Sequence, residues 1–404
     1  MLIHNRSFWL VFSSFLLPSA SHLLTIYAFS FYLLEHYAEN PEYVSTAELM
    51  NTLPVLAGFL LIGLAVDRFH RKRLALASLA FRFIFAAGIL VCLSFDWLAG
   101  LFLMLLLRMF FHKMFVTMEM AIIQGLLEPH QFVKVASLKQ FINGTLAITG
   151  SFIALYVYRQ WGMAGIMAID CLFTVASYLL MRRVEIPSTA SLPNGPLPSA
   201  LQSLSTLWFD MKQGFIYVWS GRTLRSFLLA FIVFGLLNAV LATLPLYSMR
   251  YELTNDVAVY QNYAVWFTFT LGSSFVVGSL TSSLWRNTQN AETLIKICML
   301  LLCFLVTALG FIPVPLLFFI TVFVVGYIIV LINIRIGGWL PRIVEPAFMG
   351  RAYALLDPAS LGAKTLGLLI CGWVFPHLLP LTSLYLLFGA LLLLGTVSVW
   401  RLLK

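Results

Sequence analysis

Apolar runs of about twenty residues follow one another along this chain from Phe8 almost to Leu403. Of its 404 residues, 61% are hydrophobic and only 10% are charged, and the mean hydropathy is +0.94. Such a chain cannot surround a water-soluble core with polar surface, so lipid must solvate it. Because a helix needs about 20 apolar residues to cross a hydrocarbon core of roughly 30 Å, the sequence predicts an all-α integral membrane protein.

Polar breaks between the apolar runs predict about twelve transmembrane helices. The expected spans lie near residues 8–33, 45–66, 74–95, 98–122, 135–158, 162–181, 224–248, 260–284, 293–312, 314–335, 353–375 and 378–400. If both termini are placed inside, only Arg159 and Arg250 among the Lys and Arg residues near span ends fall on the outer side. This bias predicts a multi-pass membrane protein with both termini in the cytoplasm.

The break between the sixth and seventh spans is rich in proline and predicts a flexible linker between two six-helix halves. We expect an N-terminal bundle at residues 1–183, a cytoplasmic linker at 184–223 and a C-terminal bundle at 224–404. Apolar residues at three- and four-residue steps predict an amphipathic helix in the linker: Leu201, Leu204, Trp208, Met211, Phe215 and Val218. We interpret this helix as a tether, with a regulatory role as the alternative.

A burst of charge separates the second and third spans, in the run Gly63-Leu-Ala-Val-Asp67-Arg68-Phe-His70-Arg71-Lys72-Arg73. A purely topological anchor would need the bases but not Asp67. A carboxylate near guanidinium groups and a facing helix end can instead form a breakable latch. Two halves that look like diverged copies, joined by a cytoplasmic link, are typical of a transporter built from repeats, with its site between the halves.

In this motif the chain resembles the major facilitator superfamily (MFS), whose second loop carries the signature G-x-L-a-D-R-x-G-R-[RK]. The matching residues are Gly63, Asp67, Arg68, Arg71 and Lys72, whereas His70 stands in place of a glycine. The resemblance implies the MFS fold and a cytoplasmic gate that locks and releases the inner ends of the two halves. It also matches Arg108 to the buried arginine of the family's fourth helix.

Shorter pieces are similar to the bacterial macrolide-efflux and siderophore-export branch of the family, and this resemblance implies a location in the bacterial inner membrane. They are Ala168-Ile-Asp170, Lys212-Gln-Gly214 and Gly350-Arg351. Antiporters of the family often carry a Gly-Pro pair in the fifth span. The corresponding run here, from Gly144 to Ser151, has no proline.

Three ionisable residues share one face of the fourth span. Arg108 lies roughly 15 Å from its start, and an ionised group at that depth costs at least ~2.5 kcal/mol on insertion scales. At about 100° per residue, His112 falls about 40° and Glu119 about 20° from Arg108, whereas Lys113 points about 140° away. We expect a polar cavity in which Arg108 holds an anionic group and His112 or Glu119 exchanges protons. The alternative is a structural ion network that pins helix packing.

Further charges lie inside other predicted spans. We expect Asp170 in the sixth span and Lys364 in the eleventh to line the same cavity, and Arg82 lies two turns into the third span. Asp357 either takes part in coupling or caps a helix that begins at the next residue, a proline. His22, midway along the first span, is either a satisfied polar residue or a proton site.

The bases in this wall outnumber the acids, which favours a substrate with a carboxylate, such as a metallophore or siderophore. We therefore expect a secondary active transporter that works by alternating access and exports a small organic molecule at the expense of the proton gradient. A multidrug or macrolide efflux pump and a lipid flippase are the alternatives. Walker, H-E-x-x-H and G-x-S-x-G motifs are absent from the sequence, so neither an enzyme nor an ATP-driven pump is expected.

The rest of the composition gives no indication of a cofactor or of a macromolecular partner. The five cysteines lie within apolar runs, without the spacing of a metal site or a disulfide framework. The net charge of +9 follows from loop bases, so it does not indicate nucleic-acid binding. We expect a monomer whose partners are a small-molecule substrate, protons and the lipid bilayer, with no bound cofactor or metal.

Overall fold

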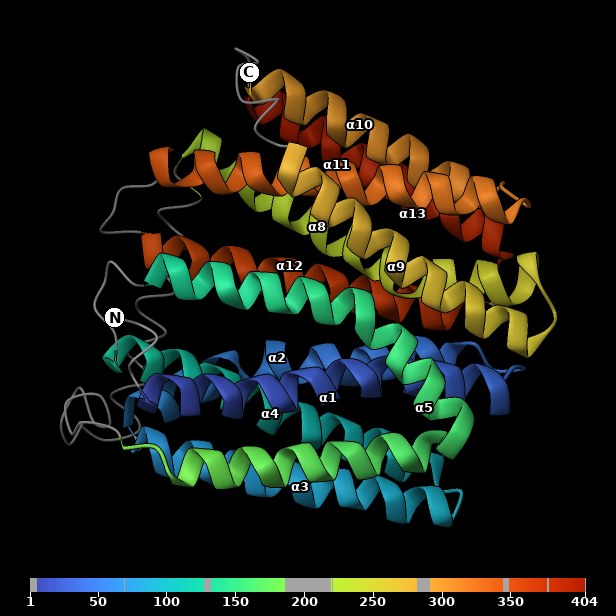
Figure 1. The fold of residues 1–404 in the computed structure, drawn as a ribbon. Helices are drawn as coiled ribbons and strands as arrows, with labels where there is room; N and C mark the ends of the chain where they lie inside the picture. The colour runs from blue at the N-terminus through green and yellow to red at the C-terminus, as the bar shows by residue number, and fades with distance from the viewer. Residues whose placement is uncertain are drawn as a thin grey trace. The chain divides into compact units, whose positions relative to one another are not determined.

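The computed structural model describes residues 6–68, 70–126, 132–185, 219, 221–281, 291–343, 349–375 and 378–403, which are helical almost throughout (Figure 1). The elements are α1 (Arg6–His36), α2 (Glu42–Arg68), α3 (Arg71–Ser94), α4 (Leu98–Leu126), α5 (Phe132–Arg182), α8 (Arg222–Tyr247), the π-helix η3 (Ser248–Leu253), α9 (Val257–Thr281), α10 (Ala291–Leu309), α11 (Pro315–Ile343), α12 (Met349–Val374) and α13 (Leu381–Leu403). Within these residues, eight helices are long and apolar enough to cross a membrane. The predicted all-α membrane fold is confirmed.

Helix α5 contains the predicted fifth and sixth spans, joined at Gly162. This glycine has φ 62° and ψ −163°, a backbone conformation that is essentially restricted to glycine. Figure 1 shows the chain doubling back along α5, so that its two parts run in opposite directions. The prediction of two spans with a break near residue 160 is therefore correct.

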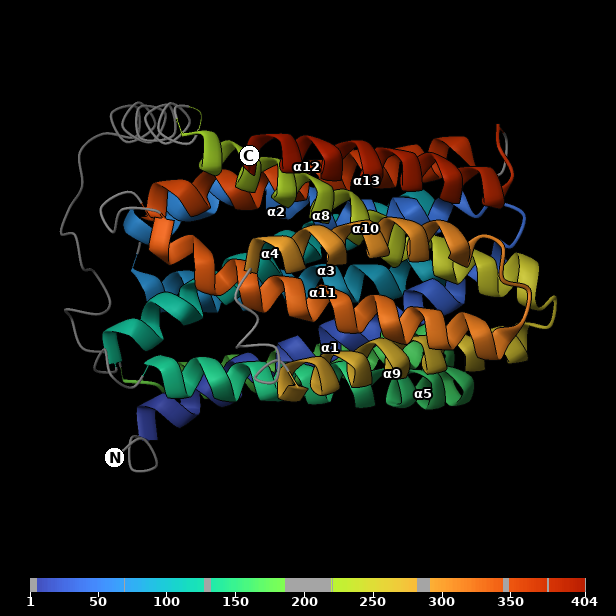
Figure 2. The same ribbon diagram turned by 90° about the horizontal axis from the view of Figure 1, so that it is seen from above.

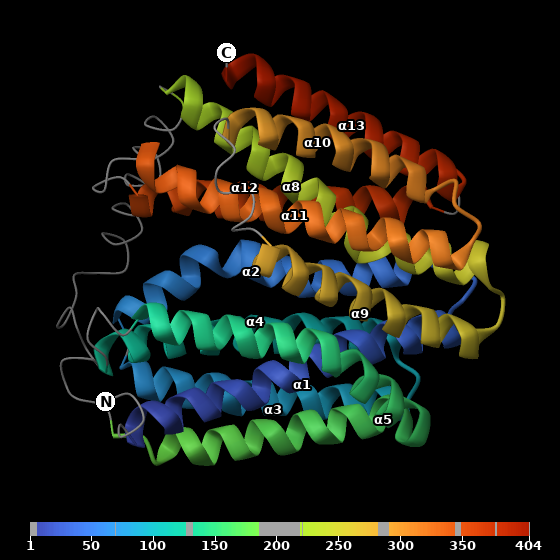
Figure 3. The same cartoon turned by 45° about the horizontal axis from the view of Figure 1, so that its top comes forward.

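The chain forms two compact units. The first contains residues 1–32 and 50–204, and the second contains residues 33–49 and 205–404. In the first unit, α3 packs against α4 and α5. In the second, α8 packs against α12 and α13, α9 against α11, and α10 between α11 and α13 (Figures 2 and 3). Most of the predicted linker and its amphipathic helix lie outside the described residues.

The surfaces of both units carry large exposed apolar side chains. In the second unit, for example, the exposed fraction is 81% for Trp373 and 74% for Leu280. Side chains of this kind face solvent rarely in a water-soluble protein, but they match the hydrocarbon of a bilayer. The surface therefore agrees with the membrane assignment made from composition.

A proline inside α1 leads to a hydrogen bond between two helices of the first unit. Pro18 has no backbone N–H, so the carbonyl of Ser14 lacks its usual partner within the helix. The hydroxyl of Ser177 on α5 donates a hydrogen bond to that carbonyl. The break in the α1 hydrogen-bond ladder therefore becomes a contact between α1 and α5.

The charged motif produces a short connection between helices, with α2 ending at Arg68 and α3 beginning at Arg71. Of Gly63, Asp67 and Arg68 the structure describes only the helical backbone, so the predicted latch at Asp67 lies outside the described part of the structure. Lys72 is described, and its Nζ donates hydrogen bonds to the carbonyl oxygens of Arg182 at 3.0 Å and Val184 at 2.6 Å.

Arg182 is the last residue of α5 and Val184 lies two residues beyond it. The last carbonyls of a helix lack partners within the helix. A positive charge at this end is also favourable because of the helix dipole. Lys72 therefore ties α3 to α5 within the first unit, which is a different contact from the lock between halves that the family resemblance implies.

Lys72→Met is expected to lower stability by about 1 kcal/mol, since it removes two charge-assisted hydrogen bonds from a partly exposed site. For a unit of this size, the melting temperature in detergent should fall by roughly 3 °C. Arg73→Met is the matched control, because Arg73 is exposed. An equal loss in both variants would show that the Lys72 contacts add no stability.

Candidate functional site

A cluster of three charged side chains lies in the first unit, and we call it the arginine–aspartate cluster. It consists of Arg82 on α3, Arg108 on α4 and Asp170 on the second part of α5. All three residues have an exposed fraction of 0%. Ionised groups buried so deeply must be paired, because leaving one without a partner is strongly destabilising.

Asp170 binds both arginines. Arg108 grips the carboxylate with two hydrogen bonds, from Nε to Oδ2 at 2.8 Å and from Nη2 to Oδ1 at 2.9 Å. Arg82 donates from Nη2 to Oδ1 of the same carboxylate. Two guanidinium groups and one carboxylate leave the cluster with one positive charge in excess.

Helix α1 supplies neutral acceptors to the cluster from successive turns. Ser21 Oγ accepts a hydrogen bond from Arg82 Nη2 at 3.0 Å, and Thr25 Oγ1 accepts one from Arg108 Nη2 at 3.1 Å. These residues are four apart and therefore share one helix face. Among the described residues, Nε of Arg82 and Nη1 of Arg108 are buried without a hydrogen-bond partner.

Two histidines adjoin the cluster. The rings of His22 on α1 and His112 on α4 lie 4.4 Å apart at an angle of 37°. Nη1 of Arg82 lies 3.4 Å from Nδ1 of His112. Because arginine can only donate, this contact requires His112 Nδ1 to accept, which places the proton of a neutral His112 on Nε2. Nδ1 of His22 is buried with no hydrogen-bond partner in the described part of the chain.

The structure brings together four of the residues selected from the sequence, namely Arg108, His112, Asp170 and His22. Arg108 has a protein carboxylate as its partner, as the ion-network alternative expects. Glu119 is also fully buried, roughly 16 Å along α4 from Arg108. Lys113 is half-buried on the same helix.

Lys364 and Asp357 both lie on α12 in the second unit. Nζ of Lys364 lies 3.4 Å from Oε2 of Glu48, with which it forms an ion pair. Asp357 is exposed. The helix-capping interpretation of Asp357 is wrong, because α12 begins at Met349 and Pro358 lies inside the helix.

Sequence reasoning noted Arg82 as an intramembrane charge but left it out of the proposed cavity wall. Its guanidinium group contacts Asp170, Ser21 and His112. Its position in the middle of an apolar run was a sufficient signal to include it. Ser21 and Thr25 gave no such signal, because hydroxyl groups are common in membrane helices. Glu48 was missed because it falls near the expected start of the second span.

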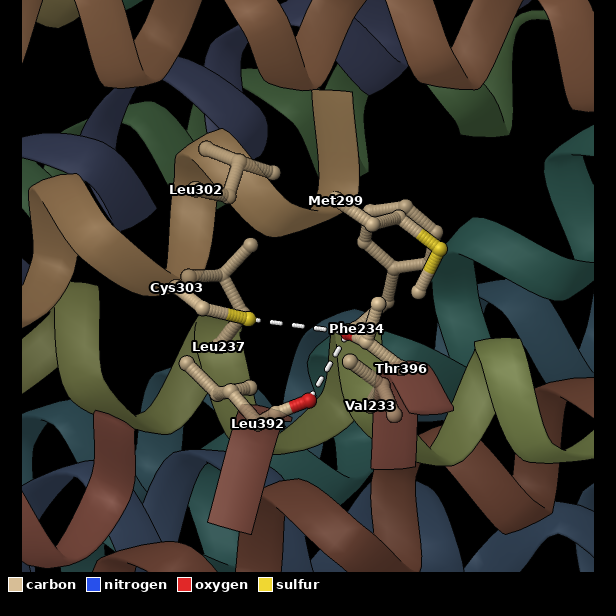
Figure 4. Close-up of a pocket in the computed structure, with 8 residues that line it drawn as sticks. All are labelled: Val233, Phe234, Leu237, Met299, Leu302, Cys303, Leu392 and Thr396. Atoms are coloured by element: carbon tan, nitrogen blue, oxygen red, sulfur yellow. Dashed lines mark hydrogen bonds between the residues drawn. The ribbon is translucent and has the colours of Figure 1, made fainter. Parts of the chain in front are cut away.

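The second unit contains an apolar pocket between α8, α10 and α13 (Figure 4). It is lined by Val233, Phe234, Leu237, Met299, Leu302, Cys303, Leu392 and Thr396. The Sγ of Cys303 lies 3.5 Å from Oγ1 of Thr396, and the other six lining residues are apolar. The pocket has no charged group that could recognise an ionised substrate. No potential metal site of three or more His, Cys, Asp or Glu side chains occurs among the described residues.

A bundle of membrane-length helices with an ion cluster buried inside one of its units defines the class as a polytopic membrane protein. Residues 10–357 match the family model of the Major Facilitator Superfamily, so the chain belongs to that family. The sequence-based assignment to this family is confirmed, and so is the prediction that the chain is a transporter of small molecules and not an enzyme.

Among curated proteins, the chain is 30% identical to an uncharacterized MFS-type transporter, YkuC, of Bacillus subtilis (strain 168), over 97% of this chain and 91% of that protein. It is 24% identical to macrolide efflux protein A of Streptococcus pyogenes, over 91% of this chain and 88% of that protein. The latter similarity agrees with the macrolide-efflux branch suggested by the sequence.

Solved structures share the fold at low sequence identity. A bacterial homologue of the iron transporter ferroportin, in an inward-facing state, has a TM-score of 0.75 and 13% identity, and the match covers 100% of this chain and 99% of that one. The nucleoside transporter NupG has a TM-score of 0.73 and 14% identity, with 99% of each chain covered. A D-xylose-proton symporter has a TM-score of 0.71 and 14% identity, with 99% of this chain and 98% of that one covered.

Proposed function

We propose that this transporter is a proton-coupled exporter of a small organic anion, for example a carboxylate-bearing metallophore or siderophore. It would work by alternating access in the bacterial inner membrane, as a monomer with both termini in the cytoplasm. The observation that carries the proposal is the excess positive charge of the arginine–aspartate cluster, together with its unused donors.

The cluster can attract an anion without losing its own carboxylate. Asp170 accepts from Nε and Nη2 of Arg108 and from Nη2 of Arg82, while Arg82 Nε and Arg108 Nη1 have no hydrogen-bond partner in the described structure. Buried donors of this kind normally find a partner in protein, water or ligand. A substrate carboxylate would satisfy both donors and neutralise the excess charge, and arginine suits carboxylates because its donors form a planar fork.

The coupling proton would be exchanged next to this site. His112 accepts a hydrogen bond at Nδ1 from Arg82 and is therefore neutral in this state. Its ring lies beside that of His22, tilted by 37°, and Nδ1 of His22 has no hydrogen-bond partner in the described structure. An exchange of protons at His112, or at Glu119 on the same helix face, would couple transport to the proton gradient without breaking the Asp170 ion pairs.

A second candidate function is macrolide or multidrug efflux. It is favoured by the similarity to macrolide efflux protein A of Streptococcus pyogenes over most of both chains. A lipophilic cation would gain nothing from an excess of positive charge, so this candidate requires a substrate site away from the arginine–aspartate cluster. The two functions therefore predict different effects of mutating Arg108.

Untargeted metabolite profiling can separate these functions. Cells with and without the gene would be grown under metal starvation and under challenge with a macrolide antibiotic. We expect an anionic metabolite to accumulate in the medium only when the gene is present, and Arg108→Ala to reduce that export at least tenfold, about 1.4 kcal/mol of lost interaction.

Protein amount in the membrane must be measured in parallel, because Arg108→Ala also removes a partner of Asp170. Macrolide efflux would replace anion export as the proposed function under two conditions. Macrolide resistance must depend on the gene and persist in Arg108→Ala, and no anion may be exported. Movement of a fluorescent lipid in proteoliposomes, with no soluble substrate exported, would instead identify a flippase.

A further inference from the structure

Helices α8 and α13 of the second unit run antiparallel. The hydroxyl oxygen of Ser248, directly after α8, lies 2.9 Å from that of Tyr385 near the start of α13. A Cβ on Gly395, in the second half of α13, would contact Val233 in the first half of α8. The contacts therefore move toward the end of α13 as they move back toward the start of α8.

Helix α10 is also antiparallel to α13. A Cβ on Gly310, directly after α10, would lie 2.7 Å from the Cβ of Tyr385. Further back along α10, Sγ of Cys303 lies 3.5 Å from Oγ1 of Thr396. The start of α8, the start of α10 and the end of α13 therefore lie at one end of the second unit (Figure 3). We call it the basic end.

The charges in the sequence of these three helix ends are mostly positive. Gly221 caps the start of α8 without a side-chain hydrogen bond, and the first turn of α8 has no acidic residue. The N-terminus of a helix favours an anion, and so does an excess of positive charge. The three helix ends carry four bases and one acid, namely Arg222, Arg225, Lys296 and Arg401, and Glu292.

Two buried donors at the basic end have no hydrogen-bond partner among the described residues. They are Nε of Arg225 and Nε1 of Trp400, which lies in the last turn of α13. Both nitrogens can only donate. Buried donors normally find an acceptor in protein, water or ligand, and a phosphodiester group provides several acceptor oxygens. Tryptophan is also typical of the level of lipid headgroups.

The apolar pocket of Figure 4 lies deeper along the same three helices. Val233 is eight residues from Arg225, roughly 12 Å along α8, and Thr396 is four residues from Trp400, roughly 6 Å along α13. The headgroup region of a bilayer is only about 5–8 Å thick on each side. A phospholipid with its phosphate at the basic end would therefore have its acyl chains at the level of the pocket.

The pocket suits a hydrocarbon chain because its polar groups are paired with each other. The hydroxyl of Thr396 donates to the carbonyl oxygen of Leu392 at 2.8 Å, so the thiol of Cys303 must donate to Thr396 (Figure 4). The other six lining residues are apolar, and an apolar cavity stays dry. Phe304 and Leu394, near the lining residues in sequence, are exposed, so lipid chains border this part of the unit.

We propose that the second unit binds an anionic phospholipid, with the phosphate at the basic end beside Arg225 and Trp400 and one acyl chain in the apolar pocket. A lipid tail gains little by exchanging lipid neighbours for apolar side chains, so the headgroup supplies most of the preference. The arginine–aspartate cluster lies in the other unit. The inference therefore does not depend on the proposed function.

Thermal unfolding of the purified full chain in detergent tests the headgroup. Phosphatidylglycerol is added, and phosphatidylcholine with the same acyl chains and inorganic phosphate are the comparisons. We expect only phosphatidylglycerol to raise the melting temperature. In Arg225→Gln, the lipid concentration for half of the effect should increase about tenfold, since a charge-assisted hydrogen bond is lost. Each variant is compared with its own lipid-free sample, so a less stable variant remains informative.

Two further variants serve as controls for Arg225→Gln. Arg225→Lys retains the charge and should bind phosphatidylglycerol more tightly than Arg225→Gln. Arg183→Gln changes an exposed arginine directly after α5 in the first unit and should bind like the parent. The proposal is overturned if phosphatidylcholine or inorganic phosphate stabilises the protein equally, or if Arg225→Gln binds phosphatidylglycerol as tightly as Arg183→Gln.

Photo-cross-linking tests the pocket. A phosphatidylglycerol that carries a diazirine in one acyl chain is illuminated with the protein in lipid nanodiscs, and the cross-linked peptides are identified by mass spectrometry. We expect them to contain residues near Cys303 and Thr396. Cys303→Leu, which fills the pocket, should remove most of these cross-links. Cys298→Leu is the matched control, because Cys298 is buried on the same helix but does not line the pocket. Equal yields in the two variants would contradict the proposal.

Discussion

Asp170→Asn is expected to lower the melting temperature of the purified protein in detergent by about 10 °C. The substitution leaves Arg82 and Arg108, both with an exposed fraction of 0%, without their shared counter-ion. Removing one partner of a buried ion pair typically costs about 3–5 kcal/mol, and each kcal/mol shifts the melting temperature by roughly 2–4 °C at this unit size. Fluorescence-detected size-exclusion chromatography after heating measures the change.

Asp96→Asn is the control for this prediction. Asp96 is exposed between α3 and α4 with φ 49°, a conformation that asparagine also tolerates. Its melting temperature should match that of the parent. Adding Arg82→Gln to Asp170→Asn should recover part of the loss, because the buried charge returns to one excess positive charge. Equal melting temperatures for Asp170→Asn and Asp96→Asn would show that the cluster does not stabilise the first unit.

Gly235→Ala should destabilise the second unit by about 3 kcal/mol, near the upper end of the usual cost of overpacking. A Cβ at this position would lie 2.1 Å from the carbonyl oxygen of Ser360 and 2.8 Å from the Cβ of Ala363. The obstacle is a backbone atom, so no side-chain rotation relieves it and α8 must move away from α12. The melting temperature should fall by roughly 5–10 °C.

Gly362→Ala gives the matched comparison on the facing helix. A Cβ at Gly362 would have no heavy atom within 4 Å, and alanine favours a helix interior over glycine by about 1 kcal/mol. This variant should melt at the parent temperature or slightly above it. If both variants melt alike, the close approach of α8 and α12 at Gly235 is not a feature of the folded protein.

The helices were predictable because lipid imposes a simple rule on the chain. Every backbone polar group in a bilayer must be paired within its own segment, so an apolar run of about twenty residues can only be a helix. The predicted breaks near residues 34–44, 67–73 and 96–97 agree with the ends of α1, α2 and α3. The predicted span that begins near residue 353 starts four residues after the first residue of α12, Met349, because the ends of helices are the least certain part of such a prediction.

The candidate site was predictable in part. A charge inside an apolar run must face the protein interior, so Arg108, His112 and Asp170 could be selected and are indeed buried. Their pairing could not be predicted, since Asp170 lies 62 residues from Arg108 and 88 from Arg82. The prediction that Lys364 lines the same cavity as Arg108 and Asp170 rested on its charge alone. In the structure the ion-pair partner of Lys364 is Glu48.

The sequence by itself determined that this chain is an α-helical membrane transporter of the Major Facilitator Superfamily, because periodicity, apolar length and the charged motif are local properties that survive without any tertiary contact. Only the tertiary structure decided which charges meet. Asp170 neutralises Arg82 and Arg108, Lys72 holds the end of α5, and residues 33–49 pack with the second unit. These interacting residues are far apart in the sequence. Their contacts depend on how whole helices pack, which cannot be predicted from a local sequence pattern.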